Sequence, residues 1–297
     1  MGGISDEPPP VAVVICTRDR PAMLATALDA IVASVRPGDE VVVVDSASRT
    51  PETAATARQR GLRVERAELP GASRARNLGA AASTAPLILF TDDDCVVDPD
   101  WVKNMVSAFA ADPEVAFAFG RVLSDRETGP GVSLFVGSEP RRYSGAQDPL
   151  AMGHAANLAI RRSLFERLAG FDTELGAGAR FCACEDKDLF WRALSDGATG
   201  AYVPDATVVH RQWRTHTAMI RLRFDYGIGS GAFAVKMRRR DKASGSGLLR
   251  RLVLSDGVVR AMRELIAGRR AVAAGLVAKA IGALAGASRA AVRRVWR

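Results

Sequence analysis

Apolar runs alternate with helix-spaced apolar residues along the first part of the chain. Buried strands are predicted where apolar and β-branched residues gather, at residues 11–16, 40–44, 62–66 and 87–90. Between the first two runs, residues 23–32 carry apolar side chains at helical spacing. Strands that alternate with helices predict an α/β fold of the Rossmann type, with a mostly parallel sheet flanked by helices and right-handed crossovers.

The second part of the chain has a more varied pattern. Residues 101–109 predict an amphipathic helix, residues 115–122 a strand, and residues 201–204 and 206–209 two more strands. Residues 124–150 are rich in Gly, Pro and Ser, which predicts a long loop that folds over substrate. The Ser and Gly residues at 243–247 indicate a linker. A helical tail follows it, with an apolar stripe beside arginines.

Composition indicates a globular protein with a real core, because 48% of its 297 residues are hydrophobic and 25% are charged. The four cysteines are scattered, and no signal peptide precedes Val11. Both features predict reduced thiols and a cytoplasmic protein. The net charge of +8 comes from the tail, where twelve Lys and Arg stand against three Asp and Glu from Asp241 onward.

The basic tail bears on possible partners. Lys279 interrupts its most apolar stretch, so we expect no membrane-spanning segment. A basic amphipathic tail suits the inner face of an anionic membrane, and packing on the catalytic domain or on another chain is an equal alternative. Trp296 is its only aromatic residue, and this lack of interleaved aromatics argues against a nucleic-acid partner.

Three consecutive carboxylates, Asp92, Asp93 and Asp94, follow the apolar run at 87–90. The carboxyl end of a strand is where open α/β sheets bind ligands. Adjacent acids repel one another unless a cation offsets them, and their oxygens suit Mg²⁺ or Mn²⁺. In an extended segment Asp92 and Asp94 would face one metal ion while Asp93 points the other way. The alternative is a solvated acidic turn before a helix.

Polar residues also follow the first two strands. Thr17 and Arg18 follow the first, and Asp45 follows the second, where it is suited to bind a base or a ribose. The alternative for Asp45 is an ordinary turn. The chain has neither a Gly-x-Gly-x-x-Gly fingerprint nor a Gly-Lys-Ser/Thr loop, so any nucleotide is held in another way. Ser73 and the arginines around it suit phosphate oxygens, or cap a helix and face solvent.

A second acidic pair, Glu185 and Asp186, follows a glycine-rich stretch at a predicted helix start. The helix dipole keeps Asp186 ionised at neutral pH, as a general base requires. The alternative is a helix N-terminus that is simply rich in acids. His154, an isolated histidine, is expected to be a packing residue.

Taken in order, four motifs resemble those of family 2 glycosyltransferases, which are inverting enzymes of the GT-A fold. The motifs are Cys16-Thr17-Arg18, Val44-Asp45-Ser46, Gly71 through Gly79, and Phe90-Thr91-Asp92-Asp93-Asp94, and the resemblance spans residues 11–213. It implies a nucleoside-diphosphate sugar donor and a divalent metal, Mg²⁺ or Mn²⁺, that bridges the diphosphate to the acidic pair. Ser46 departs from the family pattern, in which an acid or Asn is common at that position.

The resemblance also assigns roles to single residues. It implies metal ligands at Asp92, Asp94 and, after the last strand, His210. It implies a general base at Asp186 with Glu185 beside it. The implied donor-binding residues are Thr17, Arg18, Asp45, Arg76, Asn77, Asp93 and Asn157, the last on a strand within residues 153–162 that resembles the one lining the sugar pocket.

These interpretations divide the chain and define its expected partners. We expect a flexible N-terminus at 1–10, a nucleotide-sugar-binding half at 11–98, an acceptor-binding half at 99–240 and a basic helical tail at 241–297. The donor carries UDP, GDP or dTDP, and the acceptor is a glycan, a lipid-linked glycan or a small molecule. The alternative activity is a metal-dependent sugar nucleotidyltransferase, which would release pyrophosphate instead of a nucleoside diphosphate.

Overall fold

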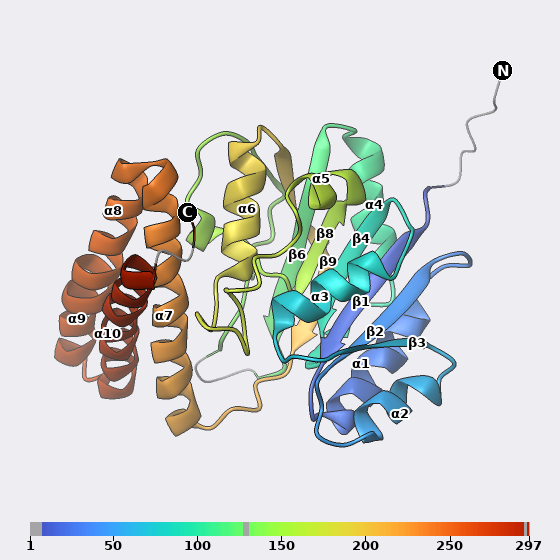
Figure 1. The fold of residues 1–297 in the computed structure, drawn as a ribbon, viewed down its shortest axis with the longest axis horizontal. Coiled ribbons are helices and arrows are strands. Elements are labelled where there is room, and N and C mark those ends of the chain that lie inside the picture. The colour runs from blue at the N-terminus through green and yellow to red at the C-terminus, as the bar shows by residue number, and fades with distance from the viewer. Residues whose placement is uncertain (1–7, 127–130, 294–295, 297) are drawn as a thin grey trace. The chain divides into compact units, whose positions relative to one another are not determined.

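The computed structural model describes residues 8–126, 131–293 and 296, and Figure 1 shows their fold. The chain separates into two compact units. Unit 1 comprises residues 1–171 and 186–212, and unit 2 comprises residues 172–185 and 213–297. Within the described residues, unit 1 holds a nine-stranded sheet in the order β3-β2-β1-β4-β8-β6-β9-β5, with β7 paired to β9.

The first half of the sheet is parallel, as predicted. Its strands are β1 (Val11–Thr17), β2 (Glu40–Ser46), β3 (Arg63–Ala67) and β4 (Leu87–Asp92), joined by α1 (Pro21–Ser34), α2 (Glu52–Arg58) and α3 (Ala72–Ala81). Thr17 pairs with Asp45, and Cys16 pairs with Asp92. The polar residues that follow these strands therefore meet at one edge of the sheet.

The second half of the sheet is mixed. It contains β5 (Cys95–Val97), β6 (Val115–Ser124), β7 (Arg141–Tyr143), β8 (Asn157–Arg161) and β9 (Thr199–His210). β8 is antiparallel to β4 and β6, whereas β6 and β9 are parallel. The two strands predicted within 201–209 form the single strand β9. The predicted loop at 124–150 contains β7 and the 3₁₀ turn η1 (Pro149–Ala151), and its residues 127–130 lie outside the described residues.

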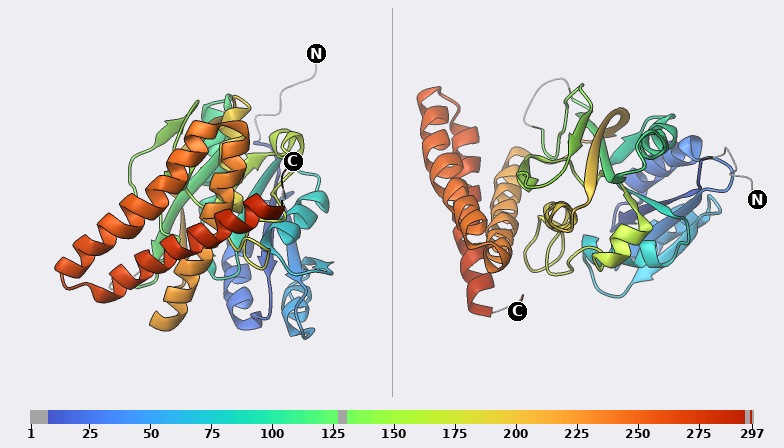
Figure 2. Two further views of the ribbon diagram at one scale, coloured as in Figure 1. Left: turned by 60° about the vertical axis from the view of Figure 1, so that its left-hand side comes forward. Right: turned by 90° about the horizontal axis from the view of Figure 1, so that it is seen from above.

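Helices cover both faces of the sheet, as the view from above in Figure 2 shows. Side chains of α1, α2 and α4 (Trp101–Ala111) pack on one face, together with Val13 and Ile15 of β1. Side chains of α3, α5 (Arg162–Arg167) and α6 (Glu185–Ser195) pack on the other face, together with Val14 and Phe90. Because both faces are buried, the central strands are continuous apolar runs.

Unit 2 is a helical unit with one added segment. It consists of residues 172–185 and the helices α7 (His216–Arg240), α8 (Lys242–Arg250), π-helical η2 (Arg251–Val259), α9 (Arg260–Ile266) and α10 (Arg270–Arg293). The segment 172–185 is bound to the helices through Asp172, which accepts hydrogen bonds from Lys236 (2.6 Å) and from the indole of Trp296. The Trp296 ring also packs on Phe181 at 5.3 Å between centroids.

Helices α7 and α10 approach each other closely at glycines. A Cβ added at Gly227, Gly231, Gly282 or Gly286 would lie 1.9–2.1 Å from a backbone carbonyl oxygen of the opposite helix. Real side chains do not tolerate such contacts, so only glycine permits this separation of the two helices.

Two expectations for the tail are wrong. The predicted linker at 243–247 lies inside α8, whose first turn is capped by the Asp241 carboxylate through the amides of Ala243 and Ser244. The expectation that Lys279 leaves the apolar stretch too short for a spanning helix also fails, whereas the absence of a membrane-spanning segment stays a prediction. Residues 270–292 of α10 pass that test by length and composition, despite Lys279, and 44% of the most apolar window is buried within the protein.

Candidate active site

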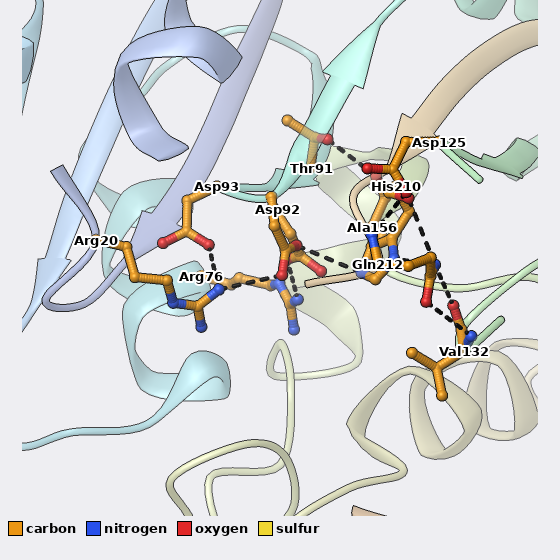
Figure 3. A network of polar contacts seen from close by, with 11 residues as sticks. Arg20, Arg76, Thr91, Asp92, Asp93, Asp125, Val132, Ala156, His210 and Gln212 are labelled. Carbon is orange, nitrogen blue, oxygen red and sulfur yellow. Dashed lines mark hydrogen bonds and ion pairs between the residues drawn. The ribbon is translucent and has the colours of Figure 1, made fainter. Parts of the chain in front are cut away.

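Asp92 is the last residue of β4, and Asp93 and Asp94 form the turn between β4 and β5, with arginines as counterions (Figure 3). The Arg20 guanidinium donates to Asp93 at 2.8 Å and to Asp94 at 3.1 Å. The Thr17 hydroxyl donates to Asp93 at 2.8 Å, and Arg76 donates to Asp92 at 2.6 Å. The expected extended geometry, with Asp93 pointing away from Asp94, is therefore wrong, because the turn brings Asp93 and Asp94 to one guanidinium.

The electrostatics of this turn favour a cation. Burial raises the pKa of Asp93 to about 7; the Arg20 guanidinium opposes this rise, and the charges of Asp94 and Asp92 add to it. The carboxylates therefore remain crowded even with arginine present. Carboxylate oxygens are the ligands that Mg²⁺ and Mn²⁺ prefer, so Asp92 and Asp94 fit such an ion by their chemistry.

His210 lies beside the acidic turn, at the end of β9 and opposite Cys95 across the strand pair β5–β9. Its Nε2 is 3.5 Å from an Asp94 oxygen. Asp94, Cys95 and His210 each offer one potential ligand atom, and these atoms lie within 4.8 Å of one another. Burial raises the pKa of the Cys95 thiol well above its usual value, so the thiol stays protonated and is a poor ligand for a hard cation.

The neighbouring Gln212 decides which nitrogen of His210 carries the proton. Its amide is fixed by Val132, whose N–H donates to Oε1 at 3.1 Å and whose carbonyl accepts from Nε2 at 3.2 Å. The Gln212 Nε2 group then donates to Nδ1 of His210 at 2.7 Å (Figure 3). The neutral ring therefore carries its proton on Nε2, which faces Asp94, and a metal ligand at that nitrogen would require the other tautomer.

The residues expected at the nucleotide lie together at the carboxyl edge of β1 and β2. Asp45 is fully buried; it accepts a hydrogen bond from the Ser48 amide at 2.9 Å and also pairs with Arg66. The turn that was the alternative interpretation of Asp45 is therefore present. Thr17 is buried against Asp93, whereas the Arg18 side chain is 43% exposed.

Asn77 and Asn157 use their amides inside the protein. Asn77 exchanges hydrogen bonds with the backbone of Phe171, at 2.8 and 2.9 Å. Asn157 is fully buried; its Oδ1 accepts from the indole of Trp101, and its Nδ2 donates to two backbone carbonyls, all at 2.8 Å. The expectation that Asn157 binds a sugar hydroxyl is therefore wrong, and Asn77 has a structural role in this arrangement.

Asp186 lies in the first turn of α6, after Glu185, and is 9% exposed. One of its oxygens accepts from the Lys187 amide at 2.7 Å, and the other lies 3.5 Å from Nδ1 of His154 and 3.4 Å from the Ala155 amide. The ammonium of Lys187 is 3.8 Å from this second oxygen and donates to the carbonyls of Met152 and Gly153.

These neighbours keep Asp186 charged. Burial alone would raise the pKa of Asp186, but the Lys187 ammonium and His154 outweigh burial and hold the pKa below its usual value of 3.8. This direction agrees with the expectation that Asp186 is ionised at neutral pH. The cause includes a buried lysine and a histidine in addition to the helix N-terminus.

One short segment, residues 155–156, contacts both Asp186 and the residue directly before the three consecutive acids. The Ala155 amide contacts Asp186, and the carbonyl of Ala156 accepts a hydrogen bond from the Thr91 hydroxyl at 3.0 Å. Thr91 directly precedes Asp92 on β4. Asp186 and the residue directly before the acids near residue 93, far apart in the chain, therefore contact adjacent residues of a single segment.

Three functional candidates, Arg20, Lys187 and Gln212, were missed by sequence reasoning. Arg20 lies in the loop after β1, and a basic residue close to Thr17 at the carboxyl edge of the sheet was a usable signal. Lys187 and Gln212 had no such signal, because their partners come from residues 152–154 and 132 and are known only from the fold.

Comparisons with known proteins show the family and the fold of the chain. Residues 12–169 match the family described as glycosyl transferase family 2. The chain is 29% identical over 271 residues to the pre-mycofactocin glycosyltransferase of Mycobacterium tuberculosis, which covers 83% of this chain and 53% of that protein. It is 27% identical over 249 residues to the O-antigen biosynthesis protein RfbC of Myxococcus xanthus, covering 76% of this chain and 19% of the relative. The chain thus spans about half or less of the length of these relatives.

Solved structures share the fold at lower identity. The mannosyltransferase PcManGT of Pyrobaculum calidifontis, in complex with GDP-Man and Mn²⁺, superposes with a TM-score of 0.62 at 20% identity, covering 94% of this chain and 88% of that one. Residues 1–349 of S. aureus TarS, in complex with UDP-GlcNAc, give a TM-score of 0.57 at 14% identity, covering 93% and 91%.

Proposed function

Because the chain belongs to glycosyl transferase family 2 and has the GT-A fold, we propose that it is an inverting, metal-dependent glycosyltransferase. It moves a sugar from a nucleoside-diphosphate sugar to an acceptor hydroxyl. The observation that carries this proposal is that adjacent residues of one short segment before β8 contact Asp186 and Thr91, the residue that directly precedes Asp92 to Asp94. Such a site has carboxylates that can bind a metal–diphosphate on one side and a general base on the other.

The metal-binding residues in this proposal are Asp92 and Asp94. Structural neighbours solved with Mn²⁺ support a divalent cation, Mg²⁺ or Mn²⁺. When bound, the cation offsets the negative charge that develops on the departing diphosphate. His210 lies against Asp94 with its protonated nitrogen and orients that carboxylate, and it becomes a third ligand only in its other tautomer.

The donor-binding residues come from the edge of β1, β2 and α3. Thr17, Arg18 and Asp45 lie where a base and ribose would meet the sheet edge. Arg76 fixes the orientation of Asp92, and Asp93 holds Arg20 and Thr17 in place. Structural neighbours solved with GDP-Man and UDP-GlcNAc support a donor that carries GDP or UDP, and the family resemblance leaves dTDP as a third candidate.

Asp186 is the base of the proposed reaction. It takes the proton of the acceptor hydroxyl while that oxygen forms a bond to the anomeric carbon of the sugar. The bond from this carbon to the diphosphate breaks on the opposite face, so the configuration inverts. Glu185, the first residue of α6, is next to the base in the chain.

In this proposal, the class of acceptor is inferred from the names of the relatives. Proteins named for O-antigen biosynthesis and O-antigen rhamnosyl transfer are among them, which supports a cell-envelope glycan or a lipid-linked acceptor. All four cysteines are free thiols in the structure, which supports a reaction in the reducing cytoplasm.

The test measures sugar transfer and donor hydrolysis with UDP-, GDP- and dTDP-sugars in Mn²⁺ or Mg²⁺. We expect Asp186→Asn to lose activity by about 100-fold or more, because the amide cannot accept the proton. The matched control is Asp196→Asn, at the other end of α6, whose carboxylate pairs with Arg167 at the surface. Full activity of Asp186→Asn would reject the base. Release of pyrophosphate instead of a nucleoside diphosphate would reject sugar transfer in favour of nucleotidyl transfer.

A further inference from the structure

Exposed large hydrophobic side chains gather in one part of the chain. Sixteen are exposed among the described residues, and eleven of them lie within residues 254–292. These eleven are Leu254, Val258, Val259, Met262, Leu265, Ile266, Val272, Val277, Ile281, Leu284 and Val292. Such a concentration on a folded protein marks a surface that contacts something apolar.

Most of these side chains form two stripes on neighbouring helices. Leu254, Val258, Met262 and Leu265 recur every three to four residues along η2 and α9, and Val277, Ile281 and Leu284 do so along α10. η2 and α9 pack antiparallel to α10, as the left panel of Figure 2 shows, through contacts of Ala261 with Ala273 and Leu276 and of Gly257 with Ala280.

Both stripes emerge on the same side of this helix pair. In η2 and α9 the exposed positions 258 and 262 directly follow the contact positions 257 and 261. In α10 the exposed positions 277 and 281 directly follow the contact positions 276 and 280. One residue is about 100° of helix rotation, and in two antiparallel helices an equal rotation away from the contact line leads to the same side. The seven stripe residues therefore form one surface, which we call the apolar face.

Arginines are exposed at the end of the pair that carries the connection between α9 and α10. Arg260, Arg263, Arg269 and Arg270 are exposed there, and the one acid among them, Glu264, is paired with Arg269. Basic residues outnumber acidic ones twelve to three from Asp241 onward. An apolar face with exposed arginines at one end of the helix pair is complementary to anionic lipid headgroups over an acyl layer.

We propose that the apolar face of η2, α9 and α10 binds the surface of an anionic lipid bilayer. The apolar side chains enter the headgroup region, and the arginines contact lipid phosphates. α10 lies on this surface and does not cross it. Its other sides pack against α7 and η2, with glycines in backbone contact, so only one side is available to hydrocarbon. This surface is defined by the helices alone and does not depend on the proposed sugar transfer.

The test is flotation of the full chain with vesicles of phosphatidylcholine, with and without phosphatidylglycerol. We expect flotation only with the anionic vesicles, and release at high salt. The double variant Met262→Glu with Ile281→Glu should weaken binding at least tenfold while the protein stays folded, because these side chains are 58% and 54% exposed. The matched control, Leu69→Glu with Val136→Glu, changes side chains that are 61% and 62% exposed in unit 1 and should bind like the parent.

Four outcomes would overturn the proposal. Failure of the parent chain to float with anionic vesicles rejects the surface, and equal flotation with neutral vesicles rejects the role of the arginines. Dissociation of an oligomer by the Met262→Glu and Ile281→Glu variant, seen by light scattering, assigns the apolar face to a second copy of the chain. Resistance of the membrane-bound protein to carbonate extraction assigns α10 to a spanning helix.

Discussion

At the scale of single residues, the notable group is the buried Lys187 beside Asp186. Its ammonium donates hydrogen bonds to the carbonyls of Met152 and Gly153 and lies 3.8 Å from the nearer Asp186 oxygen. The same charge lowers the pKa of Asp186, which keeps the base ionised but makes it weaker. Lys187 is therefore a positioning residue: its charge favours the ionised form of Asp186 and at the same time makes Asp186 a weaker base.

Replacing Lys187 by Met should change the pH dependence of the enzyme. Burial raises the pKa of Asp186 and the Lys187 ammonium opposes this rise, so without the ammonium the pKa is higher than in the parent and the carboxylate protonates at higher pH. We expect the acid limb of kcat/KM to move to higher pH in the variant, whereas in the parent Asp186 stays ionised throughout the range from pH 5 to 8. The measurement is the pH profile of nucleoside diphosphate release.

The control for this profile is Lys103→Met, which removes a lysine whose side chain is 71% exposed on α4. It should reproduce the parent profile. Superimposable acid limbs for Lys187→Met and the parent would show that Lys187 does not set the charge of Asp186.

At the scale of elements, the helix pair α7–α10 depends on backbone contact. The glycines at 231 and 282 bring Ala283 and Phe224 carbonyl oxygens to within 2.1 Å of where a Cβ would lie. The segment 172–185 is fixed to the same helices through Asp172, Lys236 and Trp296. A change in the separation of α7 and α10 would therefore also disturb the segment 172–185, which leads into α6 in the chain.

Gly231→Ala should destabilise the protein by about 1–3 kcal/mol, because the added methyl forces the two helices apart. The matched control is Gly247→Ala in α8, where nothing lies within 4 Å of the added Cβ. That change should stabilise by about 0.5–1 kcal/mol, since alanine is the better helix former. Urea denaturation of the full chain measures both. An unchanged free energy of unfolding for Gly231→Ala would mean that α7 and α10 can move apart without loss of stability.

At the scale of the whole molecule, the acidic turn has its own counterions. Arg20 bridges Asp93 and Asp94, and Arg76 holds Asp92. The fold therefore does not depend on a metal to relieve the repulsion between these carboxylates. In the proposed mechanism, by contrast, the bound cation offsets the charge of the departing diphosphate.

Removal of the metal by a chelator should therefore abolish activity and leave the stability of the protein nearly unchanged. We expect EDTA to abolish sugar transfer while the melting temperature of the protein changes by less than about 2 °C, and Mn²⁺ to restore the activity. Thermal melting and an activity assay on the same sample measure both quantities. A large fall in melting temperature in EDTA would show that the metal is part of the fold.

How far the sequence predicted the structure differs between its two halves. The parallel strands β1 to β4 and the helices between them were predictable, because strands buried on both faces are continuous apolar runs. The mixed order of β8, β6 and β9 was not, since pairing between distant strands leaves no local pattern. The turn at Asp93 and Asp94 was missed because spacing rules for strands assume an extended chain.

Single contacts also decided which site residues could be predicted. Asp186 was recognisable as an ionised acid from its position at a helix start. Asn157 was assigned to substrate by the family resemblance, and its buried partners Trp101, Arg121 and Ala206 come from distant elements that the sequence does not connect. The false linker at 243–247 arose because Ser and Gly composition outweighed the cap at Asp241, and only the structure shows that cap in use.

The glycine contacts between α7 and α10 have a consequence for recognising related chains. Gly227 and Gly231 are separated by one helical turn, as are Gly282 and Gly286, and each meets the opposite backbone. A side chain at any of these four positions would push the two helices apart, whereas most surface positions of these helices accept other residues. Two such glycine pairs, in helices about fifty residues apart along the chain, would therefore serve as a fingerprint of this tail where overall similarity has faded.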